Sequence, residues 1–299
     1  MRIRLWLLLP IVVLLLAALV LHFLRLDVLL WQSWRLSSQA LPEQALNLAR
    51  YRVDIEALPV EGIDDDLSAL TFNSETGTLW SVLNGEPLLV ELSPDGRLLR
   101  SVRLEGVSDM EGLTHVEGRR FVIAEERSQR LILLDLPDEA QVLDVSGLPS
   151  LSLGLDGEGN KGFEGLSWDE RQQRLLVVRE RDPLRVLAVR GFVDAGPQTS
   201  LRVEVRELKP SDSPTLFMRD LSSLTWHAPS GHLLLLSDES HMLVEYAADG
   251  QPLSLLGLWR GMAGLRRTVP QAEGVTVGPD GAIYLVSEPN LFYRFTPQP

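Results

Sequence analysis

The sequence predicts an all-β fold, a five-bladed β-propeller that follows one N-terminal transmembrane helix. Three observations lead to this prediction. An apolar segment of bilayer length occupies the first 24 residues. From residue 51 onward, short stretches of alternating apolar residues are separated by Gly, Pro, Asp and Asn, and long helical periodicity is absent. Within that second part, one short motif recurs five times at similar spacing, which is typical of repeat architectures.

The predicted membrane helix covers residues 5–24 (LWLLLPIVVLLLAALVLHFL), which contain no Asp, Glu, Lys or Arg. Twenty helical residues span roughly 30 Å, the thickness of the bilayer hydrocarbon. Because Arg2 and Arg4 precede the segment, we expect residues 1–4 in the cytoplasm and residues 51–299 in the periplasm, beyond the inner membrane. A cleaved signal peptide, with a weak cleavage site at residues 38–40, is the alternative. The apolar run is longer than the 7–15 residues typical of such peptides.

Residues 25–50 link the predicted anchor to the β-rich part. Trp31 and Trp34 follow the span closely, and Trp is enriched at the membrane–water interface. We therefore expect an interfacial segment, and then a polar spacer over residues 36–50.

The repeated motif has the form of a short polar start followed by an apolar strand. Its copies start at Asp66, Asp109, Gly162, Asp220 and Gln271, which are 43, 53, 58 and 51 residues apart. A period near 50 residues, with about four strands in each unit, is typical of propeller blades.

Each copy continues as a turn and further strands. The clearest expected second strands are residues 233–236 and 283–286, and the clearest third and fourth strands are residues 88–92 and 98–104. The last copy has about three strands before the chain stops, so the alternating segment 51–57 (YRVDIEA) is expected to supply the fourth strand and close the ring. A sixth blade within residues 140–160 or 190–218 is the alternative.

The third residue of each copy is polar, and the fold would bring these five positions together around one axis. They are Ser68, Glu111, Glu164, Ser222 and Glu273. Buried carboxylates so close together raise one another's pKa unless they share protons or bind a cation. Oxygen ligands without cysteine favour a hard ion, calcium before magnesium. The alternative is that these side chains only bind the backbone of neighbouring blades.

A second polar set ends the expected second strands, on the same face of the propeller. It comprises Asn84, Glu126, Glu180, Glu239 and Glu288. Arg127 and Arg181 directly follow two of them, and Asn290 lies two residues after Glu288. Glu is slightly disfavoured in strands, so its recurrence is not explained by strand formation. The set indicates a polar ligand pocket, or ion pairs between blades that fix the ring, or both.

Composition excludes several classes of function. The chain has no cysteine, which rules out disulfides, thiolate metal sites and thiol catalysis. Its net charge of −13 argues against nucleic acid as a partner. Neither a Gly-x-Ser-x-Gly elbow nor a phosphate-binding P-loop is present.

The chain resembles the SdiA-regulated family of bacterial envelope proteins. The matching segments together span about residues 60 to 296: 66–72, 76–79, 109–113, 125–127, 160–166, 237–240, 270–275 and 287–292. This resemblance implies a β-propeller behind an N-terminal membrane segment, and no known reaction. The order Ser, Glu, Glu, Ser, Glu around the ring is also similar to that of the calcium ligands in the five-bladed calcium-activated nucleotidases (apyrases).

Two functions therefore remain open. The first is a non-enzymatic module that uses the calcium-bearing face to bind a small ligand or an envelope protein. The alternative is a calcium-dependent hydrolase of phosphoesters or nucleotides, in which Glu126 or Glu239 would act as a base. The residues that bind phosphate in the nucleotidases have no clear counterparts here, so the sequence favours the binding module.

Overall fold

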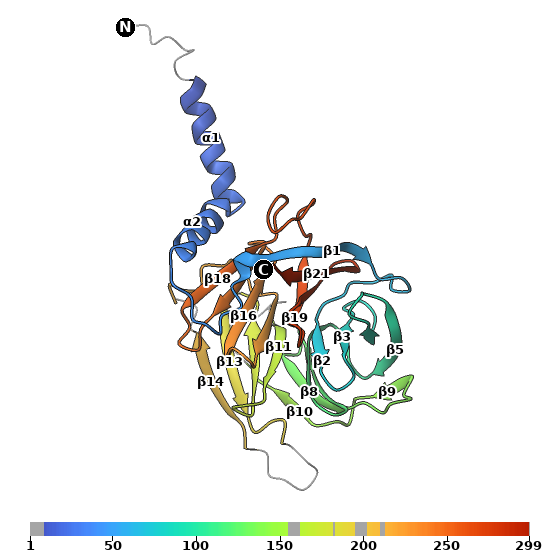
Figure 1. Cartoon of the computed structure of the whole chain (residues 1–299). Helices are drawn as coiled ribbons and strands as arrows, with labels where there is room; N and C mark the ends of the chain where they lie inside the picture. The colour runs from blue at the N-terminus through green and yellow to red at the C-terminus, as the bar shows by residue number, and fades with distance from the viewer. Residues whose placement is uncertain (1–8, 155–161, 182, 195–201, 210–212, 299) are drawn as a thin grey trace, which may run out of the picture.

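The computed structural model describes residues 9–154, 162–181, 183–194, 202–209 and 213–298. Two helices, α1 (Leu9–Phe23) and α2 (Leu26–Ser37), precede a short 3-10 turn, η2 (Leu48–Arg50), and the strands. The strands form five sheets arranged around a common axis, and α1 projects away from them (Figure 1). The fold is therefore a five-bladed β-propeller, as predicted.

Each blade is an antiparallel sheet whose first strand lies at the axis. Blade 1 contains β2 (Thr71–Asn73), β3 (Thr78–Val82), β4 (Leu88–Leu92), β5 (Leu98–Glu105) and the parallel addition β9 (Val142–Asp144). Blade 2 contains β6 (Met110–Glu117), β7 (Arg120–Glu125), β8 (Arg130–Asp135) and β10 (Ser150–Ser152). Blade 3 contains β11 (Phe163–Asp169), β12 (Arg174–Arg179), β13 (Arg185–Arg190) and β14 (Glu204–Lys209). Blade 4 contains β15 (Ser223–His227), β16 (His232–Ser237), β17 (Met242–Tyr246) and β18 (Pro252–Gly257).

Blade 5 joins the two ends of the propeller chain. It contains β19 (Ala272–Val277), β20 (Ile283–Ser287), β21 (Leu291–Pro297) and, as its outermost strand, β1 (Tyr51–Pro59). β1 pairs with β21 in an antiparallel register from Tyr51 opposite Pro297 to Pro59 opposite Leu291. The closure predicted for residues 51–57 is confirmed.

The two segments considered for a sixth blade instead extend blades already present. Residues 140–160 supply β9 to blade 1 and β10 to blade 2, and residues 190–218 supply β14 to blade 3. In the described residues these segments contain single outer strands rather than a complete sheet, so the prediction of five blades was correct.

Apolar side chains and hydroxyl groups both hold neighbouring blades together. Between blades 4 and 5, for example, Leu234 and Leu236 of β16 share one buried cluster with Ile283 and Leu285 of β20. Near the axis, hydroxyls late in the repeated motif accept hydrogen bonds from the next inner strand: Thr71 from His115 N–H at 3.1 Å, Thr114 from Trp168 N–H at 3.0 Å and Ser167 from Trp226 N–H at 2.8 Å.

The N-terminal helices differ in their exposure. No residue of α1 is buried, whereas α2 buries Leu29, Gln32 and Leu36 against blade 4.

Among the described residues no single helix meets the length and hydropathy of a membrane span. By length and composition alone, α1 and α2 could do so together, but they meet at a bend of 74°. Residues 5–8 of the predicted span lie outside the described residues.

The segment predicted to be a polar spacer is fastened to blade 4. The backbone N–H groups of Leu46 and Asn47 donate to the carboxylate of Glu245 at 2.8 and 3.2 Å, and that of Leu48 donates to Ser254 Oγ at 2.9 Å. Glu245 is fully buried and also accepts from Ser254 and contacts His232. This interior network fixes the chain just before β1.

Closure by β1 predicts a large effect for Tyr51→Ala. The Tyr51 ring is 1% exposed and its hydroxyl donates to the Gly281 carbonyl at 2.8 Å. Removing a buried aromatic ring costs about 3–5 kcal/mol of unfolding free energy. Val205→Ala, at a 42% exposed position on the outermost strand of blade 3, should change it by about 0.5 kcal/mol or less. Urea unfolding of both variants measures the difference, and equal stabilities would show that β1 does not hold the ring closed.

Candidate functional site

The three glutamates of the predicted ring occupy the same irregularity in their blades. In β6 the pairing with β7 shifts between Met110 and Gly112, so Glu111 is the extra residue. Glu164 is the extra residue in β11 and Glu273 in β19, in each case just before a glycine. A β-bulge of this kind turns a side chain out of the regular alternation. The fold thereby aims three carboxylates at the axis.

Glycine follows each of these glutamates because the inner strands approach closely there. A Cβ atom on Gly274 would lie 2.7 Å from the backbone carbon of Ala69, and one on Gly165 would lie 2.8 Å from the backbone nitrogen of Leu224. Contacts this short with the backbone of the next blade leave no room for a side chain. The Glu-Gly pair therefore combines a polar side chain at the axis with close packing of the blades.

The ring carboxylates are buried and influence one another. The pKa of Glu111 is raised to about 8, mainly by burial and also by the charges of Glu126, Glu288 and Asp109, while the Ser68 hydroxyl beside it acts to lower the pKa. Burial also holds the pKa of Glu164 well above its usual range, and the Glu111 and Glu273 carboxylates add to the shift. The three glutamates thus influence one another electrostatically. Among the described residues, however, Glu111 and Glu164 fall in two separate groupings of close acids that share Glu126, and Glu273 is in neither.

Glu273 responds to the same surroundings. Burial holds its pKa well above the usual range, and the charges of Asp238, Glu111 and Glu288 add to the effect. A set of buried acids that disfavour their own ionised forms becomes favourable when a cation or shared protons supply the missing positive charge.

The two serines of the ring are buried and differ in their partners. Ser222 is 3% exposed, and its hydroxyl donates to the Ala272 carbonyl at 2.7 Å. Ser68 is 1% exposed, and its Oγ makes no hydrogen bond of good geometry within the described part of the chain. The Ser68 hydroxyl nevertheless lies beside the Glu111 carboxylate, and its interaction with that carboxylate lowers the Glu111 pKa.

Two residues of the second predicted set join the ring directly. The Asn84 amide donates to Glu111 Oε1, and Glu126, 9% exposed, accepts from Gly162 N–H at 3.2 Å. Burial raises the pKa of Glu126, while the Gly162 N–H lowers it. Carboxylate oxygens of Glu126 come within 4.8 Å of two groupings, one with Asp109 and Glu111 and one with Glu164 and Glu180.

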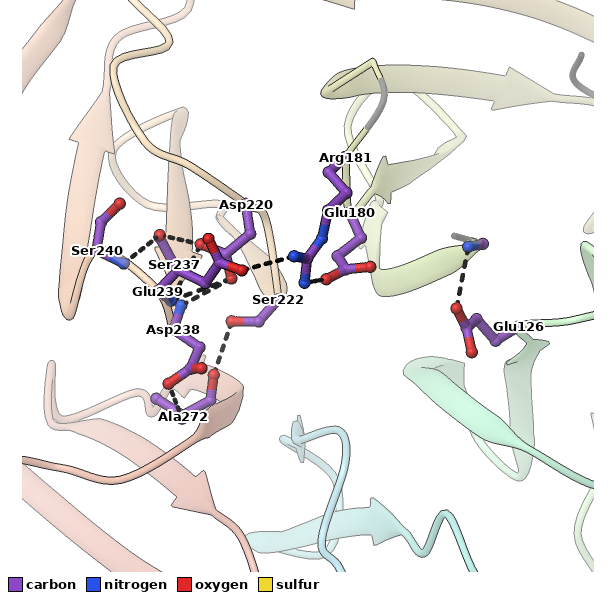
Figure 2. Close-up of polar contacts among 11 residues, drawn as sticks. Glu126, Glu180, Arg181, Asp220, Ser222, Ser237, Asp238, Glu239, Ser240 and Ala272 are labelled. Carbon is purple, nitrogen blue, oxygen red and sulfur yellow. Dashed lines mark hydrogen bonds and ion pairs between the residues drawn. The ribbon is translucent and has the colours of Figure 1, made fainter. Parts of the chain in front are cut away.

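The charged residues after the second strands form ion pairs at the rim. Arg181 pairs with its neighbour Glu180 and, at 2.5 Å, with Glu239 of blade 4, so it links two blades (Figure 2). Arg127 Nε contacts Asp109 Oδ2 at 3.1 Å, and the Arg127 side chain is 68% exposed. The pair of Arg181 with Glu239 is an ion pair between blades, as one of the two interpretations of the sequence expects. The ligand pocket of the other interpretation stays a prediction.

Glu288 and Asn290 follow the second strand of blade 5 and differ in environment. The pKa of Glu288 is raised to about 7, mainly by burial and also by the charges of Asp66 and Asp238. The Asn290 amide donates to the Ile63 carbonyl at 2.5 Å. Glu288 thus belongs with the acidic residues Asp66 and Asp238 near the axis. The contact of Asn290 instead connects blade 5 to the chain segment that leads into blade 1.

Two aspartates, Asp220 and Asp238, hold the backbone in place near this face, and neither was a predicted site residue. Asp220 is 2% exposed and accepts hydrogen bonds from the Ser237 hydroxyl and from the N–H groups of Asp238 and Glu239 (Figure 2). Asp238 Oδ1 in turn accepts from Ala272 N–H at 3.1 Å, which ties blade 4 to blade 5. The available signal was the Asp that begins three of the five motif copies, at residues 66, 109 and 220.

The donors present suit a hard cation. They are carboxylate and hydroxyl oxygens, and the side chains of Ser68, Glu111, Glu126, Glu164 and Ser222 among them are buried. Calcium takes six to eight such ligands in flexible geometry. Calcium therefore fits this donor set.

Comparison with known proteins places the chain in a family. It matches the SdiA-regulated family over residues 43–296. The chain belongs to that family, as its resemblance implied, and a five-bladed β-propeller is its folded part.

Solved structures show similar architecture. A luciferin-regenerating enzyme aligns with a TM-score of 0.51 at 14% identity, covering 82% of this chain and 95% of that one. A chain of a nidogen/laminin complex aligns with a TM-score of 0.48 at 15% identity, covering 75% and 72%. The propeller domain of Myceliophteria thermophila Cps50 (Swd1) aligns with a TM-score of 0.42 at 12% identity, covering 80% and 65%. At 14% identity the first of these supports the propeller fold alone.

The close approach behind the ring predicts that Gly274→Ala destabilises the protein. Its new methyl group would press on the Ala69–Leu70 backbone, and overpacking of this kind costs about 1–3 kcal/mol of unfolding free energy. Gly147→Ala is the matched control, because nothing lies within 4 Å of that position. Thermal unfolding should separate the two variants by several degrees. Identical melting temperatures would contradict the role given to the Glu-Gly pair.

Proposed function

We propose that this protein is a membrane-anchored periplasmic binding module that holds calcium at the axis of its propeller. The observation that carries the proposal is the group of mutually repelling carboxylates at the axis, with the Ser68 hydroxyl beside Glu111. In this account the cation supplies the positive charge that the buried acids lack.

The residues proposed to hold calcium are those of the ring, namely Ser68, Glu111, Glu164, Ser222 and Glu273. Glu126 is proposed as a further ligand because its carboxylate is close to both acidic groupings. When bound, calcium would supply positive charge and open coordination positions to a ligand that enters the mouth. The protein's own groups would orient that ligand.

The mouth around the proposed calcium is polar and mostly acidic. Glu180, Glu239 and Glu288 carry negative charge there, while Arg127 and Arg181 are already paired with carboxylates. This composition supports a small ligand rich in hydroxyl or cationic groups, or an envelope protein with a complementary basic surface. Nucleic acid is disfavoured by the same charge.

Hydrolysis of phosphoesters or nucleotides is our second proposed function, after ligand binding. Glu126 has a raised pKa and could act as a base, which is the observation that keeps the idea open. The surplus of carboxylates at the mouth would repel a polyphosphate, so binding is the better supported function.

Membrane anchoring is supported by the composition and exposure of the N-terminus. All of α1 is exposed and apolar, and α2 carries Trp31 and Trp34 on its exposed side, with 59% and 64% of their surfaces accessible. Apolar surface of this extent would be buried by a bilayer.

The calcium proposal predicts metal-dependent stability. A chelator should lower the melting temperature of the purified protein, and calcium should restore it more fully than magnesium, because the assembled site exists only in the folded state. Glu164→Gln removes one charged ligand and should weaken this response. Glu170→Gln, at an exposed position of the same repeat, should respond like the unmodified protein. If chelator leaves every melting curve unchanged, the ring serves to bond the blades and holds no metal.

A further inference from the structure

A hollow of about 510 Å³ lies at the end of the channel opposite the ring of predicted calcium ligands. Every blade contributes to it the hydroxyl residue that stands three positions after the ring residue. These residues are Thr71, Thr114, Ser167, Thr225 and Thr276. Three residues of extended strand span roughly 10 Å. This hydroxyl mouth is therefore separate from the proposed calcium site.

The described blades use three of the five hydroxyls to bond to one another. Thr71, Thr114 and Ser167 each accept an N–H group of the next inner strand, whereas the Thr225 and Thr276 hydroxyls make no hydrogen bond within the described residues. Thr225 is 7% exposed and Thr276 is 5% exposed. Neither hydroxyl oxygen is among the fully enclosed polar atoms that lack a partner, so both have accessible surface in the hollow.

The lining of the hydroxyl mouth is neutral overall and partly aromatic. Its charged side chains, Glu170 and Arg171, are adjacent in the chain, opposite in sign and exposed. Burial lowers the pKa of His227, which therefore stays uncharged at pH 7. Phe72 and Trp168, from two different blades, are half-buried and border the same hollow. A few placed polar groups beside aromatic surface are typical of sites for small molecules.

We propose that the hydroxyl mouth binds a neutral sugar, at a second ligand site independent of the calcium. Sugar hydroxyls donate and accept hydrogen bonds, as threonine hydroxyls do, so Thr225 and Thr276 would each bond to one of them. The apolar face of the sugar ring would lie against Trp168 or Phe72. A charged ligand would find no net opposite charge to offset its lost hydration.

Saturation-transfer NMR of the full chain in mild detergent, with glucose, galactose, mannose and N-acetylglucosamine, tests this proposal. The unmodified protein should transfer saturation to at least one of the four sugars. Thr225→Val and Thr276→Val keep the shape of the side chain and remove its hydroxyl. Each should weaken the affinity for that sugar about tenfold, the effect of losing one hydrogen bond to the ligand.

A matched control is Thr296→Val, because Thr296 is a half-buried threonine of β21 outside the hollow. This variant should bind the sugar like the unmodified protein. All three variants should also melt like the unmodified protein, since neither Thr225 nor Thr276 bonds through its hydroxyl to the described part of the chain. Loss of sugar binding together with a large drop in melting temperature would indicate a structural role for these hydroxyls instead.

Other outcomes also overturn the proposal. One is no saturation transfer to any of the four sugars, and another is equal affinity in the two threonine variants. Tighter binding of glucuronate that Arg171→Gln abolishes would make the hollow a site for anions.

Chelation separates this site from the calcium proposal. Below the melting temperature, a chelator should leave sugar binding unchanged, because the hydroxyl mouth lies at the other end of the channel. Sugar binding that disappears with calcium would place the sugar at the acidic end and overturn the hydroxyl mouth. Melting curves that ignore chelator would overturn the calcium site alone.

Discussion

Electrostatic repulsion among Glu111, Glu164 and Glu273 is the destabilising interaction that the packing around the axis, or a bound cation, has to offset. Each of these acids lies in a bulge at the start of an inner strand, where Glu111 and Glu164 are buried and Glu273 is half-buried, and desolvation raises the pKa of all three. The cost of burying one ionised carboxylate without compensation amounts to several kcal/mol. Either the packing of the blades offsets this unfavourable free energy of burial, or a bound cation neutralises the charge and so removes it.

The packing around the axis shows how the fold accommodates this cost. Glycine after each ring glutamate allows inner strands to approach, and hydroxyls further along the same strands accept hydrogen bonds from the next blade. At the rim, Arg181 joins blades 3 and 4, and Asp238 joins blades 4 and 5. The same polar residues that build the mouth therefore also close the ring, which explains why binding and stability should be linked in this protein.

Most of the fold was readable from the sequence because its repeats specify it. The period near 50 residues and the alternation in residues 51–57 each follow from local geometry, and each corresponds to a feature of the structure. Two things were not readable. The approach of Glu126 to two acidic groupings depends on side-chain conformations set by neighbouring blades, whereas the pairing of Arg181 with Glu239 is an ion pair between blades of the kind that the sequence indicated. The docking of α2 was missed because Leu29, Gln32 and Leu36 lie in a region dominated by the apolar signal before it.

Crystals of the propeller grown with calcium, examined by long-wavelength anomalous diffraction, test the central claim most directly. The account predicts one strong anomalous peak at the axis, in contact with Glu111 and Glu164 and adjacent to Ser68. It also predicts that this peak is lost in the Glu164→Gln protein under the same conditions. A clear map with no peak, in which the ring carboxylates hydrogen-bond to one another and to water, would contradict the account.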